Sequence, residues 1–506
     1  MKKILPMDGY NQQLIEYVHP NDWVNPQPAD IYDLVVIGAG TAGLVVAAGA
    51  AGLGLGLKVA LIERHLMGGD CLNFGCVPSK TIIRSSRIVG EIWRGQELGI
   101  GAGEIEIDFG TIMERMRRIR SQISHHDSAA RFKSLGVDVF LGDGQFTSND
   151  AVTVGKQVLK FKKAVIATGA RAATPQIPGL AEVGYLTNET VFSLVECPRR
   201  LAVIGGGPVG CELAQTLQRL GCEVVLLHRS SHILNKEDRE AAEILQQVLI
   251  KEGVNLILDC QLQQVTATDK GKTITYHSND RSGTVTVDEI LLSTGRTPNL
   301  ESLNLAQVGV DYDAKGVRVN DYLQTTNPRI YAAGDVCMKW QFTHAADAAA
   351  RIVIKNTLFS PFGLGKSKLS SLVMPWVTYT DPEIAHVGLS ADDAQKQGIQ
   401  FDTIKILMSS VDRAITDGET DGFVKIIHRR GSDEILGATI VTSHAGDIIS
   451  EVTTAMVNKI GLSKLSSVIH PYPTQADCIK KAADAYRRTL LTPRTKKILG
   501  LLTKFS

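Results

Sequence analysis

The sequence lacks an excess of charge of either sign and lacks long apolar runs. Its 54 basic residues almost balance 53 acidic ones, for a formal net charge of +1. This balance argues against a general affinity for nucleic acid or anionic membranes. An uninterrupted apolar run of about 18 residues, the signature of a spanning helix, is absent. The N-terminus, MKKILPMDGY, has no apolar run long enough for a signal peptide. We therefore expect a cytoplasmic protein.

Cysteine is also scarce. Eight cysteines are mostly dispersed over 506 residues, which fits a reducing compartment better than a disulfide scaffold. Glycine is instead abundant, with 47 residues, and many glycines indicate tight turns like those of nucleotide-binding α/β proteins. A chain of this length exceeds a single core, so two to four domains are expected.

Two of the cysteines lie close together in the segment GGDCLNFGCVPSK, residues 68–80. Cys71 and Cys76 are separated by little more than one helical turn, so a modest distortion could bring the thiols within disulfide reach. Lys80 and a helix N-terminus would both favour thiolate over thiol. Two structural cysteines are the alternative. The crowding of glycines, Pro78 and Lys80 around the pair favours redox chemistry.

A dinucleotide-binding pattern precedes this segment. The buried strand DLVVI is followed by Gly38, Gly40 and Gly43 and then by an apolar helix. These glycines permit the turn, the approach of a pyrophosphate and the packing of helix on strand, respectively. Glu63 ends the next strand, where a carboxylate can accept hydrogen bonds from ribose hydroxyls. Strand, glycines, helix and acid together indicate a bound dinucleotide.

A second such pattern begins at residue 201, with Gly205, Gly207 and Gly210. Its next strand ends without an acid, because His228 stands where an NAD-type carboxylate is expected and Arg229 follows. An arginine can pair with a 2′-phosphate that a carboxylate would repel. We therefore predict NADPH rather than NADH, the alternative being that Arg229 only faces solvent. Two units suit one dinucleotide that stays bound and one that exchanges.

These motifs, in this order, resemble the flavin-dependent pyridine nucleotide disulfide oxidoreductases, which include glutathione reductase, dihydrolipoyl dehydrogenase and mercuric reductase. The resemblance runs from about Tyr32 to Arg487. It implies an α/β fold with two Rossmann-like dinucleotide-binding domains, for FAD and NAD(P), and an α+β C-terminal dimerisation domain. The expected parts are an N-terminal surface arm (1–30), the FAD domain (31–198 and 326–367), the NAD(P)H domain (199–325) and the interface domain (368–506).

The resemblance also implies roles for individual residues. Cys71 and Cys76 would form the redox disulfide, with Cys76 against the flavin and Cys71 toward substrate, and Lys80 would pair with Glu212. The expected FAD contacts are Gly38, Gly40, Gly43, Glu63, Gly69, Thr168, Gly169, Gly334 and Asp335. The expected NADPH contacts are Gly205, Gly207, Gly210, Arg229 and Gly295. No structural metal site is expected.

The family is homodimeric, and its acid–base residue comes from the other subunit's C-terminal region. Here that position is Tyr472, with Asp477 as its acid, whereas glutathione reductase and dihydrolipoyl dehydrogenase carry a histidine. Tyrosine titrates near ~10 and histidine near ~6.5, so Tyr472 is a poor base at neutral pH. Mercuric reductase also carries a tyrosine. We therefore expect a thiol-bound acceptor, with Hg(II) held by Cys71 and Cys76.

Other readings stay open, because the cysteine pair at the C-terminus and the N-terminal metal-binding domain of mercuric reductases are missing. The first alternative is reduction of a small or protein disulfide, with His470 as a substitute base. The second is a redox-sensing or complex-bound flavoprotein subunit that docks through the N-terminal arm and basic tail. Cys478 is expected in the core. The tail from Leu490 is expected to dock on its own subunit rather than on a membrane.

Overall fold

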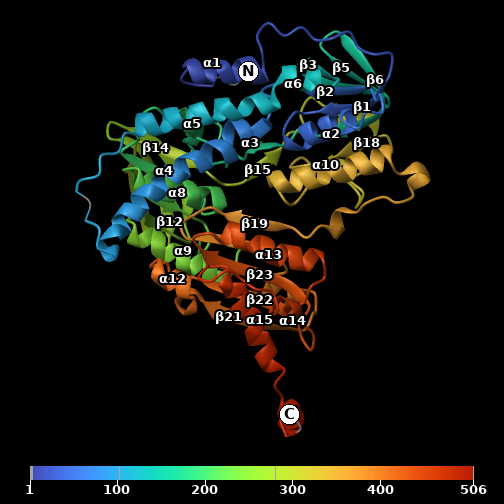
Figure 1. Ribbon diagram of the computed structural model, residues 1–506. Helices are drawn as coiled ribbons and strands as arrows, with labels where there is room; N and C mark the ends of the chain where they lie inside the picture. The colour runs from blue at the N-terminus through green and yellow to red at the C-terminus, as the bar shows by residue number, and fades with distance from the viewer. Residues whose placement is uncertain (1–3, 102, 280, 505–506) are drawn as a thin grey trace.

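The computed structural model describes residues 4–101, 103–279 and 281–504, and its first sheet is built around the DLVVI strand (Figure 1). The parallel strands run in the order β3-β2-β1-β6, and an antiparallel extension of β6 through β5 to β4 continues the sheet. β1 is almost entirely apolar and buried, as expected for a parallel strand covered on both faces. The strands are β1 Tyr32–Ile37, β2 Val59–Glu63, β3 Val137–Leu141, β4 Gly144–Ser148, β5 Ala151–Val154 and β6 Gln157–Ile166.

Helices surround this sheet and carry the cysteine pair. α2 is apolar around its whole circumference, because it packs between the sheet and a later helix, α10. Together α3 and α4 span the GGDCLNFGCVPSK segment. The helices that precede the second sheet in the chain are α1 Gly9–Val18, α2 Thr41–Ala51, α3 Gly69–Phe74, α4 Cys76–Arg94, α5 Phe109–Ser124, α6 Ala129–Ser134 and α7 Leu180–Val183.

A second parallel sheet follows, with the order β10-β9-β8-β14, and beside it lies the antiparallel sheet β11-β12-β13. Short strands β7 (Ala170–Ala172) and β15 (Arg296–Pro298) pair at the junction of the first two units. The remaining elements are β8 Arg200–Ile204, α8 Pro208–Arg219, β9 Glu223–Leu227, α9 Arg239–Lys251, β10 Asn255–Ile257, β11 Gln261–Thr268, β12 Gly271–Ser278, β13 Arg281–Val287 and β14 Glu289–Leu292.

The chain then returns to the first sheet. β18 (Ile330–Ala332) pairs in parallel with β6, and α10 (Thr343–Leu358) packs along α2 (Figure 1). The second unit is therefore inserted between two parts of the first sheet. Short strands β16 (Tyr312–Asp313) and β17 (Gly316–Val317) form a hairpin before β18.

The last unit is an antiparallel sheet with the order β19-β20-β23-β22-β21, packed by α13 and α15. With the two parallel sheets, this unit confirms the predicted fold class. Its elements are β19 Pro375–Thr378, β20 Glu383–Gly388, α11 Ala391–Lys396, β21 Phe401–Leu407, α12 Asp412–Thr416, β22 Phe423–Arg429, β23 Ile435–Thr442, α13 Ala445–Val457, α14 Leu462–Leu465, α15 Asp477–Thr489 and α16 Pro493–Leu502.

The N-terminal segment is not the surface arm that the sequence suggested. α1 packs against α5 and buries Leu14 completely. The buried Arg120 of α5 donates to Asn11 Oδ1 at 2.7 Å and to the carbonyl oxygen of Asn73 at 2.8 Å. Asn73 lies between the two cysteines of the 68–80 segment. The Arg120 guanidinium therefore connects α1 to the cysteine segment. The polar, proline-containing sequence of residues 1–30 did not indicate this connection.

The C-terminal tail also differs from the expectation, because α16 does not dock on its own chain. None of its described residues is buried, and the helix extends away from the last sheet (Figure 1). Among the described residues, no helix combines the length and the hydropathy that a bilayer crossing requires.

Candidate active site

An interruption of the helix at Gly75 brings the two cysteines together. Cys71 lies on α3 and Cys76 is the first residue of α4, while Gly75 between them has the non-helical angles φ −136° and ψ −112°. A Cβ atom at this position would lie 2.9 Å from the carbonyl oxygen of Asp70. The two side chains are separate thiols that lie close enough to shift each other's pKa. The closeness expected from their spacing is thus observed.

This arrangement makes Cys76 the more acidic thiol. A hydrogen bond from Cys71 is the largest effect that lowers the pKa of Cys76, to about 6, and Thr343 and Lys80 act in the same direction against local desolvation. The same hydrogen bond, together with burial, raises the pKa of Cys71. Thr343, the first residue of α10, lies with its Oγ1 atom 3.4 Å from Cys76 Sγ. Cys76 therefore sits at two helix N-termini, which favour an anion.

Alkylation should report this thiolate directly. In the reduced protein, we expect the rate of Cys76 alkylation by iodoacetamide to rise with pH and reach half its maximum near pH 6, because only the thiolate reacts. Cys337 is the control. Burial raises the pKa of this half-buried thiol, so Cys337 should react slowly up to pH 8. Mass spectrometry of the two peptides measures both rates. A Cys76 midpoint near ~8.5, the value of an ordinary thiol, would contradict this electrostatic picture.

Lys80 and Glu212 form an ion pair next to the thiols, as the resemblance implied. Lys80 Nζ donates to Glu212 Oε2 at 2.8 Å, and the backbone amide of Tyr379 donates to the other carboxylate oxygen at 3.0 Å. Burial acts to lower the pKa of Lys80, but Glu212 and Cys76 outweigh it and raise that pKa. Lys80 therefore stays protonated one helical turn after Cys76.

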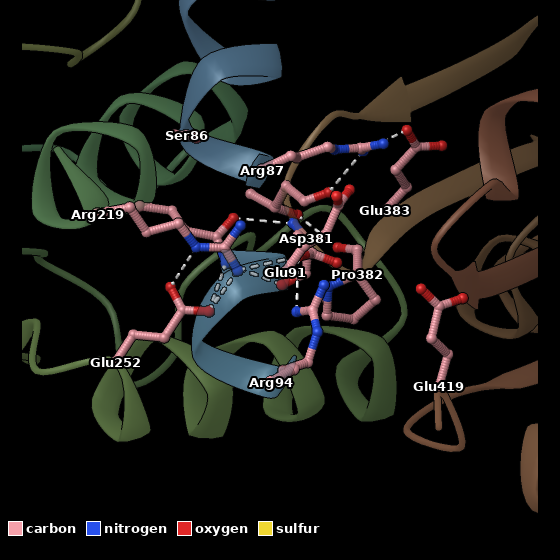
Figure 2. Close-up of polar contacts among 12 residues, drawn as sticks. Ser86, Arg87, Glu91, Arg94, Arg219, Glu252, Asp381, Pro382, Glu383 and Glu419 are labelled. Atoms are coloured by element: carbon pink, nitrogen blue, oxygen red, sulfur yellow. Dashed lines mark hydrogen bonds and ion pairs between the residues drawn. The ribbon is translucent and has the colours of Figure 1, made fainter. Parts of the chain in front are cut away.

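A buried ion cluster holds α4 and α8 in place (Figure 2). Arg219 of α8, whose side chain is only 1% exposed, donates to Asp381 Oδ2 at 3.0 Å and to Glu252 Oε1 at 2.5 Å. Arg94, the last residue of α4, donates to the same Asp381 oxygen at 2.9 Å. The helix that begins with Cys76 and the helix that carries Glu212 are thus joined through one carboxylate.

A neighbouring pair extends the cluster to the last sheet. Arg87 of α4 donates to Glu383 Oε1 at 2.5 Å and to the carbonyl oxygen of Thr380 at 3.2 Å (Figure 2). The second carboxylate oxygen of Glu383 accepts from the backbone amide of Gly446 at 2.9 Å, in the first turn of α13. All three units therefore meet at α4.

The first glycine pattern has the geometry of a phosphate-binding turn. Gly38 has φ +105°, and a Cβ atom there would lie 2.3 Å from the carbonyl oxygen of Ala167. A Cβ at Gly43 would lie 1.8 Å from the carbonyl oxygen of Gly38. A Cβ at Gly40 would meet no atom closer than 3.8 Å, the Cα of Gly69. The chain itself requires the outer glycines, whereas the middle one leaves room for a ligand, so this turn fits the pyrophosphate of FAD.

Glu63 supports the turn itself. Its carboxylate oxygens accept from the backbone amides of Ala39 and His65, each at 2.7 Å, and burial raises its pKa. Glu63 also lines a cleft at the carboxyl ends of β1 and β2 together with Gly38, Arg64, Gly142, Thr168 and Asn299.

The other expected FAD positions lie in loops of the first unit and at the start of α3. Thr168 Oγ1 donates to the carbonyl oxygen of Asn299 at 2.7 Å. Gly169 and Gly334 have left-handed φ angles of +66° and +81°. A Cβ atom at Gly69 would lie 2.6 Å from Gly40 Cα. Asp335 forms an ion pair with Arg296 at 3.2 Å, and Arg296 also binds Asp70 in α3. Arg296 and Thr343 were not among the residues expected from the sequence. Arg296 directly follows Gly295, but nothing local in the sequence points to Thr343.

The second glycine pattern repeats the first with one substitution. Gly205 has φ +113°, a Cβ at Gly210 would lie 1.9 Å from the Gly205 carbonyl oxygen, and a Cβ at Gly207 would meet no atom within 4 Å. The backbone amide of Gly206 donates to His228 Nδ1 at 3.0 Å. His228 thus takes the place that Glu63 has in the first unit.

This histidine is neutral, and its other nitrogen has no internal partner. Burial is the largest effect that lowers the pKa of His228, and Arg229 adds to it. Nδ1 accepts a hydrogen bond, so the proton lies on Nε2, which is buried without a hydrogen-bond partner among the described residues. Arg229 is exposed and forms no ion pair with the described residues. Gly295 has φ +124°, and a Cβ atom there would meet no atom within 4 Å. These features fit a nucleotide with a phosphorylated ribose.

The C-terminal candidates lie apart from the cysteines of their own chain. The Tyr472 side chain is 74% exposed and donates to Asp412 Oδ2 at 3.0 Å, a hydrogen bond that raises the pKa of Tyr472. Asp477 begins α15, with Lys481 Nζ at 3.8 Å. His470 Nε2 lies 2.9 Å from Glu451, and Cys478 is buried in the core. Among the described residues, none of these side chains contacts Cys71 or Cys76.

Comparison with known proteins agrees with this geometry. The model of the pyridine nucleotide-disulphide oxidoreductase family matches residues 32–350, and the model of its dimerisation domain matches residues 374–483. The chain belongs to this family. As a pyridine nucleotide-disulphide oxidoreductase it uses FAD and NAD(P)H, which confirms the predicted enzyme class and cofactors.

Relatives of this oxidoreductase act on different acceptors. A mercuric reductase from Staphylococcus aureus is 37% identical over 89% of this chain and 82% of that protein. A dihydrolipoyl dehydrogenase from Chlamydia muridarum is 33% identical over 92% of this chain and 100% of that protein. The HOCl-induced flavoprotein disulfide reductase RclA from Escherichia coli has 26% identity, a TM-score of 0.79, and coverage of 90% of this chain and 99% of that one.

Proposed function

We propose that this oxidoreductase passes electrons from NADPH through FAD and the Cys71–Cys76 pair to a thiol-bound acceptor, Hg(II) in particular. The observation that carries the proposal is the contact of two thiols, one of them acidic, beside the Lys80–Glu212 ion pair. Bound FAD would supply the redox chemistry that links a two-electron donor, NADPH, to the Cys71–Cys76 disulfide or to a metal ion held by the two thiolates.

The residues of the chain prepare the thiolates for this task. Cys71 and Thr343 contact Cys76 and favour its anion, while the protonated Lys80 balances its charge. Glu212 keeps Lys80 charged and oriented. Two adjacent thiolates are soft ligands of the kind that Hg(II) prefers. In the proposed homodimer, the C-terminal unit of each chain completes the site of the other.

Tyr472 favours a metal acceptor over a disulfide. A tyrosine whose pKa is raised by a neighbouring carboxylate cannot accept the proton of a departing thiol at neutral pH. Its oxygen can approach a metal ion or donate a hydrogen bond. Reduction of a small or protein disulfide is the second candidate, since the relatives include a disulfide reductase and a dihydrolipoyl dehydrogenase.

Parallel assays separate the two candidates. NADPH oxidation should be fastest with an Hg(II)–thiol adduct, compared with oxidised glutathione, lipoamide and oxygen. Tyr472→His should raise turnover with oxidised glutathione at least about tenfold, because an imidazole can act as the missing base. Tyr472→Phe, the matched control, should lower Hg(II) turnover without raising disulfide turnover. If Tyr472→Phe left Hg(II) turnover unchanged, the assignment of the acceptor would fail.

The preference for NADPH can be reversed at His228. In His228→Glu, the carboxylate should accept the Gly206 amide as Glu63 accepts that of Ala39, and it should repel a 2′-phosphate. We expect the ratio of kcat/KM for NADPH to that for NADH to fall at least about tenfold, equivalent to ~1.4 kcal/mol. His228→Gln, which keeps a neutral acceptor, should leave the ratio nearly unchanged. A wild-type enzyme that used NADH tenfold better would refute the NADPH assignment.

A further inference from the structure

A second pair of cysteines lies at the start of the second parallel sheet, away from the proposed redox pair. Cys197 is in the segment that leads into β8, and Cys222 directly precedes β9. These two strands are parallel neighbours, with Arg200 paired to Glu223. The backbone amide of Glu223 donates to the carbonyl oxygen of Arg199 at 2.7 Å, so the two entering segments are in contact. In this register Cys222 lies opposite Arg199, two residues after Cys197, so the two cysteines stand where the two neighbouring strands begin.

The two thiols are close enough to shift each other's pKa: the interaction with Cys222 lowers the pKa of Cys197, and the interaction with Cys197 raises that of Cys222. Cys222 is 2% exposed, and the half-buried Cys197 packs against the same hydrophobic cluster. Two other buried cysteines, Cys211 and Cys260, have no thiol neighbour among the described residues.

We propose that Cys197 and Cys222 form a second thiol pair that is reversibly oxidised to a disulfide by small aliphatic disulfides. This site is independent of the proposed electron path, because neither thiol contacts Cys71, Cys76 or the two glycine turns. The reaction needs no electrons from NADPH.

The two thiols differ in a way that sets the order of steps. Cys197 is the more accessible of the two, and the interaction with Cys222 lowers its pKa. Its thiolate attacks one sulfur of the small disulfide, whose S–S bond breaks and releases one thiolate, which takes up a proton. Cys222 then loses its proton and attacks Cys197 Sγ, releasing the second small thiol. Two protein thiols are oxidised and one disulfide is reduced to two thiols.

The bond would close a loop around the second nucleotide turn. The segment from Cys197 to Cys222 contains β8, the three glycines of the turn and α8 with Glu212. A cross-link here constrains the unfolded chain and leaves the sheet pairing intact.

Peptide mapping tests the pair in the holoenzyme. The protein is incubated with graded ratios of oxidised to reduced glutathione, without NADPH, then blocked with N-ethylmaleimide under denaturing conditions and digested with trypsin. Cleavage after arginine and lysine separates Cys197 (peptide 172–199) from Cys222 (220–229), while Cys71 and Cys76 share peptide 65–80. We expect a cross-linked 172–199/220–229 species that disappears on reduction, with the loss of two alkylated thiols.

Two variants test which thiol reacts first with the small disulfide. Cys222→Ala should accumulate peptide 172–199 carrying one glutathione, whereas Cys260→Ala should behave as the wild type. If both thiols remain fully alkylated at ratios that oxidise peptide 65–80, the proposal is overturned. It is equally overturned if the wild type stops at glutathionylated Cys197. Both of these outcomes come from the wild-type protein, so they stand even if Cys222→Ala fails to fold.

Discussion

Cys76→Ser is expected to lower NADPH-driven turnover with an Hg(II)–thiol adduct or a disulfide by about 10³-fold or more, over 4 kcal/mol of transition-state stabilisation. The serine hydroxyl does not ionise near neutral pH and cannot form the disulfide. Cys76 is also the thiol that Cys71, Thr343 and Lys80 jointly stabilise as an anion. No neighbouring group can therefore take over the role of the Cys76 thiolate.

The comparison with Cys71→Ser assigns the two sulfurs. Both variants lose the disulfide, but in Cys71→Ser a hydroxyl can still donate to the Cys76 thiolate. We expect NADPH titration without air to give the long-wavelength absorbance of a thiolate beside a flavin in Cys71→Ser and not in Cys76→Ser. Reduction of ferricyanide, which needs no protein thiol, should persist in both and shows that the fold and cofactor are intact. If Cys76→Ser retained the absorbance, the two roles would have to be exchanged.

Asp381→Asn should destabilise the enzyme by about 3 kcal/mol, at the lower end of the range for breaking a buried ion pair. The Arg219 side chain is 1% exposed and would keep only Glu252 as a charged partner, while Arg94 would lose its carboxylate. Thermal unfolding of the holoenzyme should show a midpoint lower by several degrees. Glu243→Gln, which breaks an exposed pair with Arg239 at 2.8 Å, is the matched control and should change stability by less than about 0.5 kcal/mol.

The loss of stability in Asp381→Asn should become smaller as the pH falls. Burial alone would raise the pKa of Asp381, but Arg219 and Arg94 outweigh it and hold that pKa below its ordinary value. The carboxylate therefore contributes stability above the pKa of the unfolded chain, near ~3.9, and this contribution is lost as pH falls through the folded value. The difference between wild type and Asp381→Asn should be constant near pH 7 and shrink below about pH 4. A constant difference down to pH 2 would show that packing, not charge, determines the effect.

The features that sequence alone predicted are those that depend on neighbours in the chain. Gly43 and Gly210 must be glycine because the carbonyl oxygens of Gly38 and Gly205, in the same turns, occupy the space of a Cβ atom. The contact of Cys71 with Cys76 needs only a short spacing and a break at Gly75. The pairing of Lys80 with Glu212 spans 132 residues and could be named only through the resemblance to a family.

The tertiary structure decided the contacts between distant segments. Thr343 meets Cys76 across 267 residues, and Arg120 joins the first helix to the cysteine segment. Periodicity and spacing report which face of an element is buried, but they do not report which other element covers it. For the same reason the N-terminal segment was expected to be a free arm and the C-terminal helix to be docked, and both expectations were wrong. The meeting of Cys197 with Cys222 follows from strand order, which only the folded sheet defines.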